Sequence, residues 1–149
     1  MPEMEHTAPE SRPLPAGYRL VAEPPGVEEY VALRRDAGLS PRTPVQAVGA
    51  IERSWAWTIV RGPEGQLAAM GRVIGDGSWY FHLADVATDP AHQRRGLGRA
   101  VMEDLLARIE DAAEPDPYIT LLADPPGQRL YRSLGFVDTA PTLGMRLDR

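Results

Sequence analysis

Two glycines, Gly96 and Gly98, stand between a strand-like run and the longest helical pattern of the chain. The first turn of a helix presents unpaired N–H groups and about half a positive charge. Glycine lets a ligand approach that backbone closely, and Arg94, Arg95 and Arg99 add cationic side chains. The segment predicts a pyrophosphate site at the helix start, against the simpler alternative of a tight helix start with solvated arginines. A dinucleotide-binding fold is not indicated, because the third glycine is missing and the preceding strand belongs to an antiparallel run.

The apolar periodicity changes along the chain in a way that predicts a single α/β domain. The expected order is βααβββαβαββ, with a mixed, mostly antiparallel sheet flanked by helices. The long helix should bury one face, made by Leu97, Val101, Leu105, Leu106 and Ile109. The expected strands are Tyr18–Glu23, Trp55–Arg61, Gln66–Ile74, Trp79–Thr88, Tyr118–Ala123 and two pieces within Phe136–Leu147 around Pro141; the expected helices are Val27–Ala37, Pro44–Arg53, Gly96 to about Ala113, and Gln128–Leu134.

Composition excludes several classes of chemistry. The 149 residues contain no cysteine, and all 16 basic residues are arginine. Disulfides, thiolate catalysis and lysine Schiff-base chemistry are therefore excluded. His6, His82 and His92 are scattered, so no zinc site and no metal is expected.

Length and charge set the expected organisation and surroundings. A chain of 149 residues with 43% hydrophobic residues fits one domain, which we place at residues 17–149 after a proline-rich flexible leader at residues 1–16. The net charge of -5 argues against nucleic-acid binding. No apolar run approaches the roughly 20 residues of a membrane span, and the N-terminus lacks a signal-peptide pattern. We therefore expect no membrane association and a cytoplasmic setting.

Two motifs carry a family resemblance. The first is Gln93-x-x-Gly96-x-Gly98, preceded by Val86-Ala87-Thr88-Asp89-Pro90; the second is Leu130-Tyr131-Arg132-Ser133-Leu134-Gly135-Phe136. Their order and distance resemble the GNAT superfamily of acetyl-CoA-dependent N-acetyltransferases over residues 18–148. The resemblance implies a GNAT-like fold and acetyl-CoA as the acetyl donor, and it leaves a homodimer open because family members often pair.

The resemblance also implies roles for individual residues. The backbone of Val86, Ala87 and Thr88 would lie beside the pantetheine arm, with the Val86 amide near the thioester carbonyl. Tyr131 would protonate the departing thiolate, although simple packing is its alternative role. Asp124 stands where the family often has asparagine, so it could accept but not donate a hydrogen bond to pantetheine. The expected pyrophosphate-binding segment is Gln93, Arg94, Arg95, Gly96, Leu97, Gly98 and Arg99.

Acetyl transfer needs a neutral amine, and the strand before the glycine loop offers two candidate bases. His82 has an imidazole whose usual pKa suits the task. Asp85 is the rival, and it interrupts an apolar face. Strict alternation points the two side chains to opposite faces, unless a bulge redirects one of them. Each also has a structural alternative: a hydrogen-bonded histidine, or a carboxylate that holds the bulge.

The implied activity is direct transfer, in a ternary complex, from acetyl-CoA to a primary amine of a small molecule. The acidic, compact chain favours a small cationic acceptor. The alternatives are acetylation of a protein N-terminus or lysine, and a sensor that binds acyl-CoA without catalysis.

Overall fold

The computed structural model describes residues 12–149, so residues 1–11 of the expected leader lie outside the described part of the chain. Leu14 already packs against the core. The elements are β1 (Arg19–Val21), α1 (Val27–Asp36), α2 (Pro44–Arg53), β2 (Ala56–Arg61), β3 (Leu67–Gly75), β4 (Tyr80–Thr88), the 3₁₀ turn η1 (Pro90–His92), α3 (Leu97–Ala112), β5 (Tyr118–Leu121) and α4 (Pro125–Ser133).

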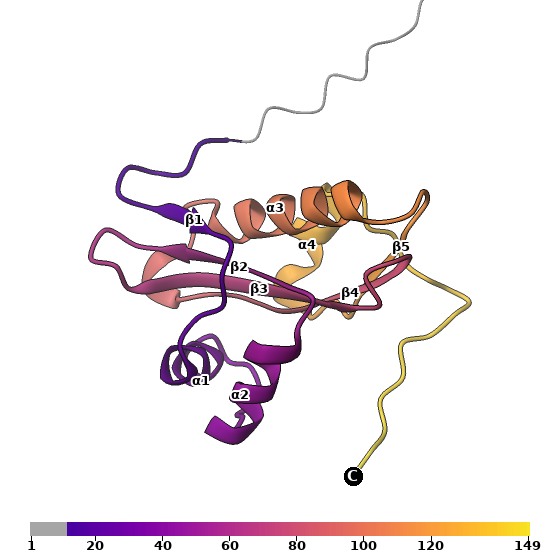
Figure 1. Cartoon of the computed structure of the whole chain (residues 1–149), viewed down its shortest axis with the longest axis horizontal. Coiled ribbons are helices and arrows are strands. Elements are labelled where there is room, and N and C mark those ends of the chain that lie inside the picture. The colour runs from indigo at the N-terminus through magenta and orange to yellow at the C-terminus, as the bar shows by residue number, and fades with distance from the viewer. Residues whose placement is uncertain (1–11) are drawn as a thin grey trace, which may run out of the picture.

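The five strands form one sheet in the order β1-β2-β3-β4-β5. Neighbours from β1 to β4 are antiparallel, whereas β4 and β5 run parallel. Helices α1 and α2 cover one face of the sheet, and α3 and α4 cover the other (Figure 1). This arrangement confirms the expected α/β class with a mixed, mostly antiparallel sheet. Within the described residues, no helix is long and apolar enough to cross a bilayer.

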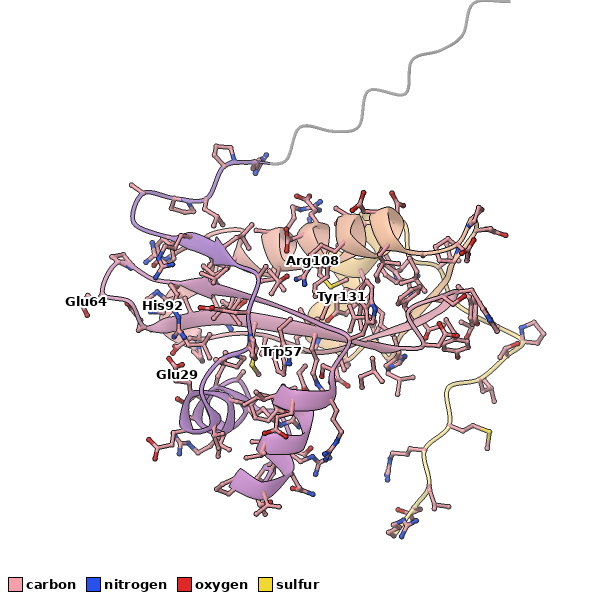
Figure 2. All side chains as sticks on the ribbon, in the orientation of Figure 1. Glu29, Trp57, Glu64, His92, Arg108 and Tyr131 are labelled. Carbon is pink, nitrogen blue, oxygen red and sulfur yellow. The ribbon has the colours of Figure 1, made fainter. Side chains whose placement is uncertain are left out.

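Each face of the sheet has its own apolar core. On the α3 side, Phe81 and Leu83 pack with Val101 and Leu105. On the α1–α2 side, Trp57 packs with residues such as Tyr30, Leu33 and Ala47. Figure 2 shows Trp57 on the α1–α2 side and Arg108 between the sheet and α3. The interior strand β2 has five consecutive buried residues, Ala56–Val60, and is therefore covered on both faces.

Local signals predicted the helices well. Thr43 and Gln46 form a capping box, with Gln46 N donating to Thr43 Oγ1 at 3.2 Å and Thr43 N donating to Gln46 Oε1 at 3.0 Å. Helix α2 consequently has the bounds expected from the sequence. Helix α4 begins at Pro125, three residues before the expected Gln128, because proline is well tolerated in a first helical turn.

The C-terminal prediction of two strand pieces within Phe136–Leu147 is wrong, because the described chain contains no strand after β5. A turn at Thr139–Thr142 is closed by a 2.9 Å bond from Thr142 N to Thr139 O. Beyond that turn the chain is extended but runs away from the sheet, as the yellow end of the ribbon shows (Figure 1). An alternating sequence pattern becomes a strand only beside a neighbour, and this segment has none among the described residues.

Strand β4 contains a bulge beside the cleft described below. Arg72 pairs with Ala84 and Met70 pairs with Ala87, so β4 has one more residue than β3 between these pairs. The extra residue lies at Asp85, which adopts a left-handed backbone conformation with φ of 55°.

The Asp85 carboxylate is held by three side chains from two other elements. Oδ2 accepts from the Tyr30 hydroxyl at 2.6 Å and from Arg72 Nε at 2.7 Å, and Oδ1 accepts from Arg34 Nη1. Asp85 and Arg34 side chains are only 9% and 8% exposed. The bulge therefore points Asp85 toward α1, and the ion pairs fasten α1, β3 and β4 together at this point.

We expect Asp85→Asn to lower the free energy of unfolding by about 3–5 kcal/mol, because the buried Arg34 and the partly buried Arg72 would lose their counter-charge. Asp36→Asn is the matched control, since the Arg35–Asp36 pair is exposed and should contribute no more than about 1 kcal/mol. Urea unfolding of both variants measures the difference. Equal losses in the two variants would contradict a stabilising role for the buried cluster.

Candidate active site

A cleft opens where β4 and β5 separate. The pairing of β4 with β5 ends at Leu83 and Leu121, and β4 continues to Thr88 paired only with β3. The cleft has a volume of about 1140 Å³, and the α1–α2 connection, α3 and α4 complete its walls. It is lined by most of the residues predicted for the site: Asp85, Val86, Ala87, Thr88, Gln93, Arg94, Gly96, Leu97, Gly98, Arg99, Asp124 and Tyr131. Arg95 and His82 are the predicted residues that do not line it.

The start of α3 forms one end of the cleft. Gly96 is the N-cap and has φ of 76° and ψ of 16°, and Arg94 has φ of 63°. A Cβ on Gly96 would meet nothing within 4 Å, so space does not require glycine at this position. The left-handed backbone conformation is what favours glycine there. A Cβ on Gly98 would lie 3.5 Å from Leu130 Cδ2 and 3.6 Å from Thr88 Oγ1. The first-turn N–H groups, which lack intrahelical partners, thus adjoin a narrow part of the cleft.

The three arginines of the loop differ in their contacts. Arg94 and Arg99 line the cleft. The Arg99 guanidinium also donates to Glu103 and to the Ser133 hydroxyl, which links α3 to α4. Arg95 instead lies over the Tyr18 ring, 5.8 Å from its centroid. Arg94, Arg99 and the helix start therefore place positive charge on this end of the cleft wall.

Tyr131 projects from α4 and lines the same cleft. Burial, and secondarily the charge of Asp124, raises the pKa of its phenol above the ordinary value. The hydroxyl is therefore protonated at neutral pH and can act as a proton donor. Gly127, four residues earlier, makes room for the ring, since a Cβ there would lie 2.6 Å from Tyr131 Cε2 and 2.9 Å from its hydroxyl oxygen. We did not predict Gly127, although a glycine one turn before the tyrosine was a readable signal.

Asp124 is the N-cap of α4 by position, but its side chain makes no capping hydrogen bond. Its carboxylate lines the cleft near the first turn of α4. In this position the carboxylate could accept a hydrogen bond from an amide N–H of a ligand. An asparagine could also donate a hydrogen bond, which an ionised carboxylate cannot.

His82 does not line the cleft. It lies in the paired part of β4, opposite Thr120 and next to the point where β4 and β5 separate. Its Nδ1 is 2.9 Å from Thr120 Oγ1, and that hydroxyl is oriented to donate to Phe81 O at 3.4 Å. If Nδ1 carries the proton and donates it to Thr120 Oγ1, Nε2 is left as an acceptor. Burial first, and the charge of Arg72 second, lowers the pKa of His82 below its ordinary value. The imidazole is therefore uncharged at neutral pH.

Asp85 lines the cleft, but its carboxylate is occupied by Tyr30, Arg34 and Arg72. Arg34 also donates to Ser40 O, from Nε at 3.0 Å and Nη2 at 2.7 Å, which ties the α1–α2 connection to the bulge. These contacts hold the bulge of β4 against α1 and β3. We had not predicted these partners; the buried i, i+3, i+4 spacing of Tyr30, Leu33 and Arg34 in α1 was the available signal.

The described residues contain no group of three or more His, Cys, Asp or Glu side chains that could hold a metal ion. Of the three histidines, His6 lies outside the described part of the chain. His92 lies at the rim of the cleft, where Nδ1 is 2.7 Å from the Tyr18 hydroxyl.

Several known proteins resemble this chain. It is 32% identical to a probable acetyltransferase from meticillin-resistant Staphylococcus aureus, whose structure superimposes with a TM-score of 0.83 over 89% of this chain and 99% of that one. Serotonin N-acetyltransferase 2 of Oryza sativa subsp. japonica is 37% identical over 90 residues, which are 58% of this chain and 44% of the relative. Histone acetyltransferase TAP1 of Glycine max is 35% identical over 71 residues, 48% of this chain and 30% of the relative. This chain thus aligns with less than half the length of these curated relatives.

The family model described as the acetyltransferase (GNAT) domain matches residues 48–145. This range contains β2 to α4, and with them both sequence motifs and most of the cleft wall. The chain belongs to the GNAT family of acetyltransferases and is an acyltransferase enzyme.

Proposed function

We propose that this enzyme transfers an acetyl group from acetyl-CoA to the primary amine of a small molecule, by direct attack in a ternary complex. One observation carries the proposal: a single cleft joins the electropositive start of α3 to the protonated phenol of Tyr131. Family members generally use acetyl-CoA, and the residues present fit it.

The donor would lie along the cleft from α3 to α4. Backbone N–H groups between Arg94 and Arg99 would bind the pyrophosphate, with Arg94 and Arg99 side chains beside it. After Leu83 the edge of β4 that faces β5 is unpaired, and it would offer backbone groups to the amides of the pantetheine arm. Asp124 would accept a hydrogen bond from one of those amides. A volume of about 1140 Å³ is ample for a long, flexible ligand.

In the reaction, acetyl-CoA supplies the acetyl group as a thioester. The amine nitrogen forms the new bond to the carbonyl carbon, and the carbon–sulfur bond breaks. The Val86 N–H, next to the bulge, would polarise the carbonyl oxygen. Tyr131 would donate its phenolic proton to the leaving sulfur. Asp85 would hold the bulge, and therefore Val86, in position through its ion pairs.

We assign His82 as the base for the amine, acting through Nε2 directly or through one water. Its imidazole is uncharged at neutral pH, and it lies on β4 four residues before Val86. Asp85 is the weaker candidate, because three donors already occupy its oxygens.

A small amine is favoured as the acceptor. The relative from rice is named for serotonin, which is a small amine with an aromatic ring. The net charge of -5 favours a cationic acceptor. The relative from soybean is named for histones, so a protein acceptor belongs in any test.

The direct test measures thiol release from acetyl-CoA with the purified chain and a panel of acceptors. The panel should contain arylalkylamines, polyamines, amino sugars, and peptides with a free N-terminus or lysine. We expect turnover with a small amine that is at least tenfold faster than with any peptide. Faster turnover of a peptide would contradict the acceptor class. Tight binding of acetyl-CoA without turnover of any acceptor would instead indicate a sensor.

We expect Tyr131→Phe to lower kcat by about 10²–10⁴-fold with little change in acetyl-CoA affinity, because the lost hydroxyl acts only as the thiolate departs. The phenyl ring keeps the contact with Phe136, so the melting temperature should be unchanged. Steady-state kinetics and calorimetric titration with acetyl-CoA measure the two quantities. A kcat within twofold of the parent enzyme, with chemistry rate-limiting, would exclude Tyr131 as the acid.

We expect kcat/KM to rise with pH through a limb below about 6.5, the ordinary imidazole value, because burial and Arg72 lower the pKa of His82. The neutral imidazole is the active form, so activity is present above this pKa and is lost below it. His82→Gln should remove this limb and slow the reaction, while acetyl-CoA affinity stays constant.

Acceptors of different basicity provide the control for His82, since ionisation of the amine gives a second limb at higher pH. A profile that follows only the amine, and that His82→Gln leaves unchanged, would show that no protein base is needed.

A further inference from the structure

The imidazole of His82 is tied to the neighbouring strand by one side-chain contact. His82 on β4 and Thr120 on β5 are register partners, and the next pair, Leu83 with Leu121, is the last before the two strands separate. Side chains at the same register position of paired strands face the same side of the sheet. Nδ1 of His82 lies 2.9 Å from Oγ1 of Thr120, and both side chains are partly buried. The contact therefore fixes the ring across the two strands at the edge of the cleft.

The surroundings of the Thr120 hydroxyl favour it as the acceptor in this contact. Its single proton is oriented toward Phe81 O, which lies 3.4 Å from Oγ1. The lone pairs of Oγ1 are then free to accept from Nδ1–H of His82. An imidazole that carries its proton on Nδ1 has its basic lone pair on Nε2. In the reverse arrangement Thr120 would donate to Nδ1, and the ring would have no free basic nitrogen.

The charges around the imidazole make a neutral partner significant. After burial, the charge of Arg72 on β3 is what lowers the pKa of His82, and the Arg72 guanidinium is itself held by Asp85. The titratable groups one pair earlier on the same face are the phenols of Tyr80 and Tyr118. A hydroxyl fixes the ring without stabilising its charged form, whereas a carboxylate in the same place would raise the pKa of the imidazole.

We propose that Thr120 is the positioning residue of the base: its hydroxyl accepts from Nδ1 of His82 and so keeps Nε2 free to take a proton from the acceptor amine. This inference rests on the proposed role of His82 in acetyl transfer. Thr120 does not line the cleft, so it acts through the imidazole and not on a ligand. Its hydroxyl selects the tautomer and the orientation of the ring, and its neutrality leaves the imidazole uncharged at neutral pH.

The first test reads the tautomer without any turnover. Nitrogen-15 spectra distinguish a protonated from an unprotonated ring nitrogen, and His82→Gln identifies the signals of His82 among those of the three histidines. At a pH where His82 is uncharged, we expect the proton on Nδ1 in the parent chain and a mixture of tautomers in Thr120→Val. A proton on Nε2 in the parent chain would overturn the proposal, whether or not the chain transfers acetyl groups.

The second test compares three substitutions of Thr120 in the pH dependence of kcat/KM. Thr120→Val keeps the size but removes the hydroxyl, and it should lower kcat/KM by about tenfold or more with acetyl-CoA affinity unchanged. Thr120→Ser keeps the hydroxyl and should retain most of the activity. Thr120→Asp places a carboxylate beside Nδ1 and should move the low-pH limb upward by about one pH unit or more. Equal losses in the valine and serine variants, or an unmoved limb in the aspartate variant, would overturn the proposal.

Thr58→Val is the matched control for the loss of a strand hydroxyl. Thr58 is fully buried on β2, and its Oγ1 donates to Asp104 Oδ2 at 2.6 Å on the α3 side of the sheet. Its removal should lower the melting temperature and leave both the tautomer of His82 and the low-pH limb unchanged. If Thr120→Val releases the Nδ1 proton but turnover stays at the parent level, His82 is not the base. That result would overturn the role of Thr120 while leaving acetyl transfer itself intact.

Discussion

The interaction on which the site depends is the buried carboxylate of Asp85 with Tyr30, Arg34 and Arg72. A left-handed aspartate in a strand is unfavourable by about 1–2 kcal/mol, so it persists only where its surroundings fix it. Here two arginines and a phenol fix it, and Arg34 extends the network to Ser40 in the α1–α2 connection. The bulge follows from this cluster, and the parallel pairing of β4 with β5 stops just before it.

The cleft that opens where β4 and β5 separate has two ends with different chemistry. At one end, the start of α3 and the arginines Arg94 and Arg99 favour a polyanion. At the other end, burial keeps the phenol of Tyr131 protonated, and Gly127 leaves space for its ring. A donor that has a pyrophosphate at one end and a thioester at the other needs this polarity. The fold thus brings the glycine loop and the tyrosine motif, which lie more than 30 residues apart in sequence, to the same cleft.

The sequence predicted the features that depend on a few neighbouring residues. The capping box at Thr43, the apolar stripe of α3 and the loop from Gln93 to Arg99 can each be recognised within a short stretch of sequence. The sequence did not predict the features that depend on contacts between residues far apart in the chain. Whether Asp85 acts as a base or holds the bulge depends on Arg34 and Arg72, which belong to other elements. The prediction of two C-terminal strands is wrong for a similar reason. Their residues have the alternating pattern of a strand, but the described part of the chain provides no neighbouring strand for them.

A crystal structure of the enzyme with coenzyme A tests the central claim most directly. We predict the pyrophosphate against the backbone amides between Arg94 and Arg99, the pantetheine between β4 and β5, and the sulfur within hydrogen-bond distance of the Tyr131 hydroxyl. The Asp85 cluster should be unchanged. A coenzyme whose pyrophosphate lies away from α3, or whose sulfur lies far from Tyr131, would contradict this assignment of the cleft.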